Sequence, residues 1–142
     1  MKWLDGSYIN IKKFSGAELC EKISLELWDY ERSEWLEFDD FIQTAVFLID
    51  FDTELCMEGI FTCLENSIGH YLPYIIKAFR TIGDNEDAEI LSEICRLACP
   101  DHELCEEVLS EIERLESQLY LNTGFDMWQL LYDYLDRKIS EL

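Results

Sequence analysis

Apolar residues recur at helical spacing along nearly the whole chain of 142 residues, and this periodicity constrains the fold more than any other feature. Prolines, which interrupt helices, occur only at positions 73 and 100, and the six glycines stand mostly where helices are expected to end. The pattern therefore predicts an all-α fold: a compact single domain over residues 1–142, built as a bundle of about six to seven helices.

Capping and breaking residues indicate the helix boundaries. Ser15 followed by Glu18 forms a capping-box pattern, which places the start of the first helix. Pro73 suits a first helical turn, and Gly83 suits the position after a helix end. The later helices are expected at about 39–57, 59–65, 73–83, 85–98, 101–119 and 126–139. The segment 39–57 is apolar enough to be the central helix.

The chain carries 31 acidic residues against 11 Lys plus Arg, a formal net charge of −20. A domain of this size is usually soluble with a net charge of about 2 to 8 in magnitude, and a larger excess destabilises the folded state by self-repulsion. We therefore expect a basic partner, a bound cation or an unusual demand on solubility. Direct binding to nucleic acid or to an anionic membrane is not expected, because both would repel this charge.

The acidic residues gather in two segments. Residues 26–65 hold 12 acids and one basic residue, and residues 81–113 hold 11 acids and one basic residue. We predict two partner-binding sectors by charge density, with solvated helix faces as the alternative. The first sector comprises Asp84, Glu86, Asp87, Glu93, Glu103, Glu106, Glu107 and Glu111. The second comprises Glu34, Glu37, Asp39 and Asp40.

The chain shows no sign of a membrane anchor or a signal peptide. Its longest apolar stretch, residues 44–50, is far shorter than the roughly 20 residues that a membrane helix needs. Asp5 and Gly6 interrupt the N-terminus before a signal-peptide core would form. We therefore expect a cytoplasmic protein, in which the six cysteines are reduced thiols.

Four residues have spacing that resembles a metal site: Cys95, Cys99, His102 and Cys105. Zinc binds three cysteines and one histidine in tetrahedral geometry. However, Cys95 and Cys99 are four residues apart on an apolar helical face, and zinc knuckles normally use two cysteines in a turn. The spacing favours buried free cysteines, and a zinc site is the alternative.

No catalytic residue and no cofactor are expected. The chain has two histidines, His70 and His102, and lacks a Gly-x-Ser-x-Gly elbow, a phosphate-binding glycine loop and a dinucleotide fingerprint. Trp35 is flanked by acids in Glu34-Trp-Leu-Glu-Phe, and we expect it to be partly exposed on a contact surface, where aromatic residues are enriched.

The segment from Asp52 to Gly83 carries a specific motif. It reads Asp-Thr-Glu-Leu-Cys-Met-Glu-Gly-Ile-Phe-Thr-Cys-Leu-Glu-Asn-Ser-Ile-Gly-His-Tyr-Leu-Pro, and Ile-Gly follows at the end of the next expected helix. From the residues alone, this is a joint between helices, with Gly69 at positive φ after a helix end.

The same motif, within residues 52–91, resembles the signature of the bacterial DNA-mimic protein family, an all-α group once catalogued as a domain of unknown function. The matching positions are Glu54, Gly59, Asn66, Ser67, Gly69 and Gly83. Glu58, Ile60 and Ile68 depart from the family pattern, so the chain is identified as a divergent member.

The resemblance implies an acidic protein whose carboxylates take the place of DNA phosphates, and it implies a homodimer. Its partner would be a basic DNA-binding protein, such as a helix-turn-helix regulator, whose access to DNA it blocks. Residues three or four apart on a helix lie about 5–6 Å from each other, close enough to form a row of charges. The alternative is an immunity-type protein that neutralises a basic toxin or nuclease, and a third candidate is an enzyme or metal protein of unknown chemistry.

Overall fold

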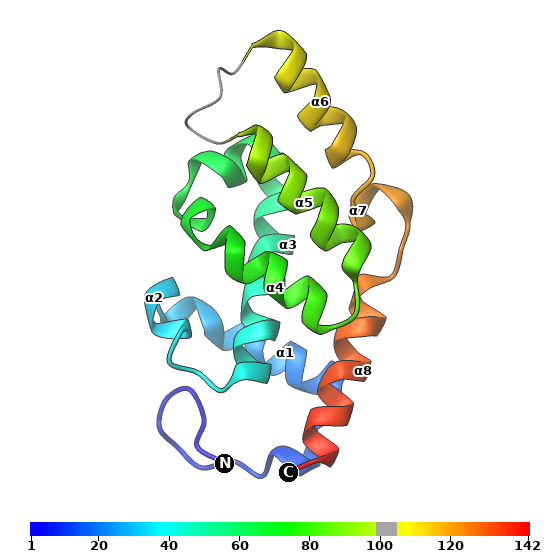
Figure 1. Cartoon of the computed structure of the whole chain (residues 1–142). Helices are drawn as coiled ribbons and strands as arrows, with labels where there is room; N and C mark the ends of the chain where they lie inside the picture. Colours follow the sequence, from blue (N-terminus) through cyan, green and yellow to red (C-terminus); the bar gives the residue numbers. More distant parts are fainter. Residues whose placement is uncertain (99–104) are drawn as a thin grey trace.

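The structure, a computed structural model, describes residues 1–98 and 105–142, and within these ranges it confirms the all-α class (Figure 1). The α-helices are α1 (Gly16–Glu26), α2 (Arg32–Trp35), α3 (Asp40–Glu65), α4 (Leu72–Thr81), α5 (Asn85–Leu97), α6 (Glu106–Glu116), α7 (Tyr120–Thr123) and α8 (Met127–Ser140). Three short 3-10 helices are η1 (Ile11–Lys13), η2 (Leu27–Asp29) and η3 (Ser67–Tyr71).

Helix α3 is the central element, as its apolar sequence predicts. It packs against α1, α4, α8 and η3 and runs through the middle of the molecule (Figure 1). Four consecutive residues, Ala45 to Leu48, are buried, so this part of the helix is covered on all sides. The other helices are amphipathic and turn one apolar face toward α3 or toward one another.

A kink divides α3 at Gly59, where φ is +81° and ψ is 175°. This backbone conformation favours glycine, because a Cβ atom would strain it. The kink separates the two helices expected at 39–57 and 59–65. The backbone N–H of Ile60 donates to Oε2 of Glu116, the last residue of α6, at 2.9 Å, so the kink also anchors the end of that helix.

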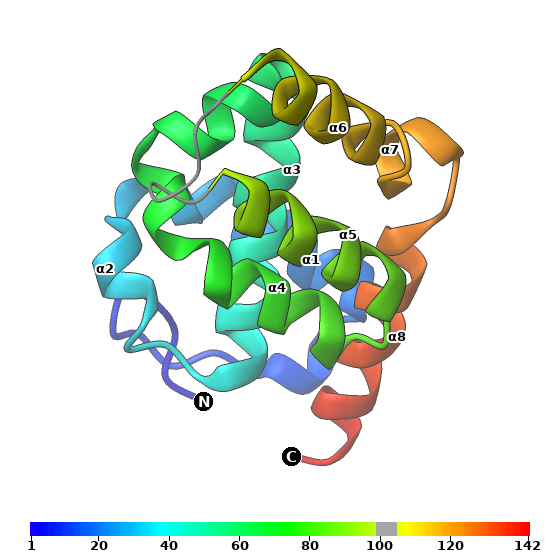
Figure 2. The same ribbon diagram turned by 45° about the horizontal axis from the view of Figure 1, so that its top comes forward.

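Helices α1 and α8 close the other end of the molecule. Ser15 and Glu18 form the expected capping box at the start of α1. The N–H of Gly16 donates to Oδ1 of Asp136 at 2.5 Å, and a Cβ atom on Gly16 would collide with the backbone carbonyl of Tyr132. This close approach brings the two chain termini to the same end of the molecule (Figures 1 and 2).

Helix α6 differs from the helix expected at 101–119. Cys105 is its N-cap, with an extended backbone (ψ 168°), so the helix begins at Glu106. Asp101, the expected cap, lies outside the described residues. The helix ends at Glu116, and a turn leads into the four-residue helix α7. This helix is too short to produce a recognisable helical periodicity in the sequence.

Trp35 is buried, so the prediction that it is partly exposed is wrong. Only 2% of the residue is accessible, and its ring meets the ring of Phe47 edge to face at 5.5 Å. Helix α2 is a single turn, and this turn points Trp35 inward while its acidic neighbours face solvent. Trp28 is the tryptophan with substantial exposure, at 50%.

Within the described residues, no helix combines the length and apolarity that a membrane crossing requires.

Candidate acidic interaction surface

The first acidic sector lies on α5 and α6, which pack against each other and run antiparallel (Figure 1). Both helices carry two acids in their first turn. The N-terminal end of a helix has a partial positive charge, which stabilises acids there. Glu86, Glu106 and Glu107 are exposed, Glu93 and Glu111 are partly exposed, and Glu103 lies outside the described residues.

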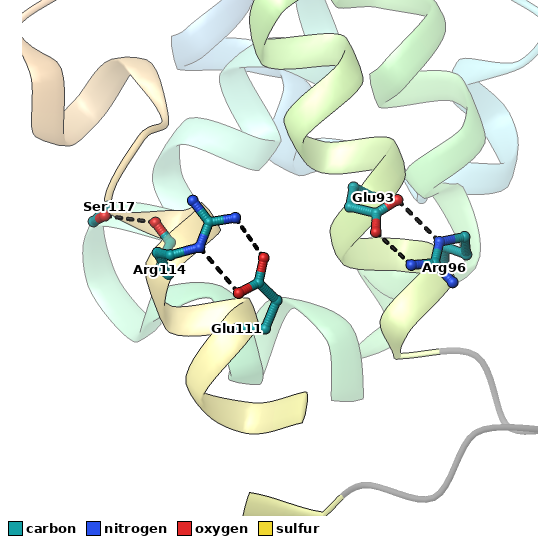
Figure 3. A network of polar contacts seen from close by, with 5 residues as sticks. All are labelled: Glu93, Arg96, Glu111, Arg114 and Ser117. Atoms are coloured by element: carbon teal, nitrogen blue, oxygen red, sulfur yellow. Dashed lines mark hydrogen bonds and ion pairs between the residues drawn. The ribbon is translucent and has the colours of Figure 1, made fainter. Parts of the chain in front are cut away.

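Two of these acids are held by arginines on the same helix (Figure 3). Nε of Arg96 lies 2.9 Å from Oε2 of Glu93, and Nε of Arg114 lies 3.0 Å from Oε2 of Glu111. In both pairs a second guanidinium nitrogen contacts the other carboxylate oxygen. The hydrogen bonds from the arginines lower the pKa of both glutamates. Each pair is neutral overall, so the two pairs interrupt the row of negative charge along α5 and α6.

Asp84 and Asp87 are buried, each only 3% exposed, and this contradicts their place in an exposed sector. Oδ1 of Asp84 accepts the backbone N–H of Asp87 at 3.2 Å and so caps α5. Oδ1 of Asp87 accepts the backbone N–H of Tyr120 at 2.9 Å. The two carboxyl groups therefore connect α5 to α7 and do not face a partner.

The surroundings of Asp87 also favour its protonated form. Burial, together with the neighbouring carboxyl group of Asp84, raises the pKa of Asp87 to about 8. Oδ2 of Asp84 is buried and has no hydrogen-bond partner among the groups that the structure describes. A protonated Asp87 supplies the missing donor, because a neutral carboxyl group next to a carboxylate donates an O–H bond.

The second sector surrounds α2 and the start of α3. Glu34, Glu37, Asp39 and Asp40 are all exposed. Oε1 of Glu34 accepts the backbone N–H of Glu31 at 3.2 Å, which orders the start of α2. Asp39 is the N-cap residue of α3. These four acids fall within seven residues of sequence, and the structure keeps all four at the surface.

The two sectors do not form one surface patch. Helix α2 and helix α6 lie far apart in both ribbon views (Figures 1 and 2). Two exposed acids on these helices escaped the sequence analysis: Glu89 on α5, which pairs with Arg80, and Glu113 on α6. Glu113 lies seven residues after Glu106, which places both on one face of α6. The i, i+7 spacing is visible in the sequence.

The motif residues build the joint between α3 and α4. Glu54 lies 3.6 Å from Arg32 in an ion pair, and Asn66 ends α3 with an extended backbone. Gly69 does not have positive φ, contrary to the expectation; a Cβ atom there would lie 2.6 Å from the carbonyl oxygen of Leu64, so close packing requires the glycine. Gly83 has a φ of +91° at the end of α4. Ser67 begins η3.

The cysteine cluster is only partly described. Cys95 is half-buried, and burial raises the pKa of its thiol to about 11, while Cys105 is exposed. Cys99 and His102 lie outside the described residues. Over residues 1–98 and 105–142, no group of three or more His, Cys, Asp or Glu side chains is arranged to hold a metal ion.

Comparison with known proteins places the chain in a family. A model of the DMP19-like protein family matches residues 36–138, which extends well beyond the motif on both sides. The match includes both acidic sectors except Glu34. No curated protein and no solved structure matches the chain. Since the family model covers more than half of the sequence, the chain belongs to the DMP19-like protein family.

Proposed function

We propose that the exposed carboxylates of this chain bind the DNA-binding surface of a basic protein, such as a helix-turn-helix regulator, and prevent it from binding DNA. Membership of the DMP19-like family implies a DNA-mimic protein. The net charge of −20 is the observation that supports this role most directly.

Association through such surfaces is driven by release of counterions. A basic DNA-binding surface that meets carboxylates instead of phosphates releases bound ions from both partners, so its affinity falls steeply with salt. The acids that are exposed and have no arginine partner within the described chain are the strongest candidates for these contacts. They are Glu86, Glu106, Glu107 and Glu113 on the first sector, and Glu34, Glu37, Asp39 and Asp40 on the second.

The test is a capture experiment from native lysate at low salt, with elution first by duplex DNA and then by rising salt. We expect a basic DNA-binding protein to elute with both. In a mobility-shift assay, the purified chain should release this partner from its duplex. A captured partner that duplex DNA does not displace would contradict DNA mimicry and favour the immunity-type alternative.

Two double variants assign the contact sector. Glu106→Gln with Glu107→Gln removes two charges from α6, and Glu34→Gln with Glu37→Gln removes two from the second sector. Glu21→Gln with Asp133→Asn is the matched control, because it removes two exposed charges on α1 and α8. The contact sector is the one whose variant loses about tenfold or more in affinity and flattens the salt dependence. Equal losses in all three variants would indicate a nonspecific effect of net charge.

We also propose a homodimer, on the basis of the family resemblance. Leu25 (76% exposed), Met57 (74%) and Trp28 (50%) are large apolar side chains left at the surface. Sedimentation velocity at low and high salt tests the oligomeric state. A dimer held by apolar contacts should persist or strengthen at high salt, because salt screens the repulsion between two chains of charge −20. A monomer at all salt concentrations would overturn this proposal.

A further inference from the structure

The basic residues of this acidic chain differ in whether they form ion pairs. Six of the 11 form ion pairs with acids within the described residues, among them Arg32, Arg80 and Lys138. Lys77 on α4 and Arg137 on α8 form no ion pair there. These two residues are 60 positions apart in sequence, yet they line the same cavity, together with Lys138.

The cavity lies between the start of α3, the middle of α4 and the end of α8 and has a volume of about 370 Å³. Small-molecule sites typically have volumes of about 300 to 1,000 Å³. Polar and apolar groups share its walls: Gln43, Thr44 and Thr81 contribute amide and hydroxyl groups, and Phe47 and Tyr74 contribute aromatic rings. The mixture suits a ligand with a charged part and an apolar part.

The ring of Tyr134 contacts both cations of α8. The guanidinium carbon of Arg137 lies 5.5 Å from the centre of the Tyr134 ring, and Nζ of Lys138 lies 5.9 Å from the same centre. On the opposite wall, the ring of Tyr74 stacks on that of Phe47, with centres 5.4 Å apart and planes 14° from parallel. Tyr74 is 38% exposed and offers a flat aromatic surface beside Lys77.

Part of this arrangement has a local explanation, and part does not. Arg137 and Lys138 lie in the last turn of α8, where cations stabilise the negative end of the helix. Lys77 is in the interior of α4, so the helix end does not explain its position. Asp40 is the one acid among the residues that line the cavity. Lys138 is paired with Glu141 at 3.6 Å, so the cations of the lining without an ion pair in the described residues are Lys77 and Arg137. These two cations against Asp40 leave the lining locally positive on a protein of net charge −20.

We propose that this cavity binds a small organic phosphate, whose phosphate group is held by Lys77, Arg137 and Lys138 and whose apolar or aromatic part lies against Tyr74. Arginine binds phosphate through two parallel N–H bonds, and lysine adds a compact point charge. The Debye length is about 8 Å at physiological ionic strength, so repulsion from acids farther away is largely screened. The nearby cations therefore dominate inside the cavity.

The test uses adenosine diphosphate and phenyl phosphate as probes, with adenosine as the uncharged control, in calorimetric titrations of the full chain. We expect both phosphates to bind with dissociation constants of about 1 mM or tighter, and adenosine to bind at least about tenfold more weakly. In amide NMR spectra, the largest shift changes should fall on Gln43, Thr44 and Thr81, which line the cavity on two different helices. No binding of either phosphate, or shift changes confined to other regions, would overturn the proposal.

Single variants distinguish phosphate binding in the cavity from a general effect of net charge. Lys77→Met and Arg137→Met each remove one exposed cation from the cavity. Arg114→Met removes one from α6 and is the matched control, since it changes the net charge equally. We expect the two cavity variants to lose about tenfold in phosphate affinity and the control to keep it. Equal affinities in all of these proteins, with unchanged thermal unfolding midpoints, would show that the cavity cations do not bind the phosphate.

Discussion

Among residues 1–98 and 105–142, carboxyl groups are buried in two regions, and the two regions neutralise them in opposite ways. At the contact of α2 with α3, Asp50 is fully buried and faces Arg32, whose Nε lies 2.7 Å from Oδ2 and whose terminal nitrogen lies 3.0 Å from Oδ1. At the start of α5, Asp87 is buried beside another carboxyl group, that of Asp84, which contributes to its raised pKa. The first region neutralises its charge with a cation, and the second with a proton.

The difference shows how a chain of charge −20 can still bury acids. A paired carboxylate requires a basic residue, and this chain has few. A protonated pair requires none, but its stability depends on pH. Tyr120 connects the second region to α3: its backbone N–H donates to Asp87, and its hydroxyl donates to Oδ1 of Asp52 at 2.6 Å. The two regions can therefore be perturbed separately.

Removing the cation from the first region should have the largest effect. Arg32→Met leaves Asp50 buried without its charge partner, and we expect a loss of about 3 to 5 kcal/mol in the free energy of unfolding. Chemical denaturation followed by circular dichroism measures this loss. The double variant Arg32→Met with Asp50→Asn should recover part of it, because no buried charge remains. A single variant as stable as the unaltered protein would mean that water reaches Asp50 readily.

The second region should respond to pH in the sense set by its raised pKa. Asp87 has an ordinary pKa of 3.8 and a folded-state pKa of about 8, so the folded state binds the proton more tightly. Its contribution to stability is then fully present below about pH 4 and is lost as the pH rises through about 8. Asp87→Asn keeps the acceptor for Tyr120 and supplies a permanent donor to Asp84. We expect the free energy of unfolding of this variant to exceed that of the unaltered protein by about 2 kcal/mol at pH 9.

Denaturation curves at pH 5, 7 and 9 check this expectation. The gap in the free energy of unfolding between the Asp87→Asn variant and the unaltered protein should widen as the pH rises. Asp84→Asn should narrow this gap, because it removes the like charge next to Asp87. Asparagine at position 84 can still cap α5, since its side-chain oxygen is also an acceptor. A gap that stays constant across this range would show that Asp87 is already ionised in the folded protein at pH 5.

Breaking the hydrogen bond between Tyr120 and α3 should have a smaller effect. Tyr120→Phe removes the hydroxyl that donates to Asp52 and leaves the backbone bond to Asp87 intact. We expect a loss of about 1 to 2 kcal/mol, typical of one hydrogen bond to a charged acceptor that water partly reaches. Thermal and chemical unfolding measure the loss. The pH dependence assigned to Asp87 should remain, and its disappearance would show that the hydroxyl also positions the aspartates.

The surface pairs of α5 and α6 should matter least for stability. Glu93→Gln and Glu111→Gln each remove an acid that is held by an exposed arginine of the same helix. Solvent screens such pairs, so we expect unfolding midpoints within the error of the measurement. Each variant should nevertheless expose a free arginine, which is measurable as weaker binding to a basic partner. A clear destabilisation would show that the two pairs act as one network across the helices.

Local sequence signals predicted the helices whose ends are set by neighbouring residues. The capping box of Ser15, the cap at Asp126 and the glycine after α4 all depend on contacts within a few residues. The arginine pairs of Glu93 and Glu111 are also local, at i, i+3 spacing, and the sequence contained the signal for them. Charge density alone does not detect these pairs, because it counts the acids in a segment and ignores the basic residues next to them.

The sequence by itself determined the helical class, most helix boundaries, the family and the acidic excess, because these depend on composition and short-range spacing. Only the tertiary structure decided that Trp35, Asp84 and Asp87 are buried and that Lys77 and Arg137 share a cavity. Asp87 meets the backbone of Tyr120 33 residues away, and the cavity joins three helices. No local pattern encodes such meetings, since they depend on how whole helices pack.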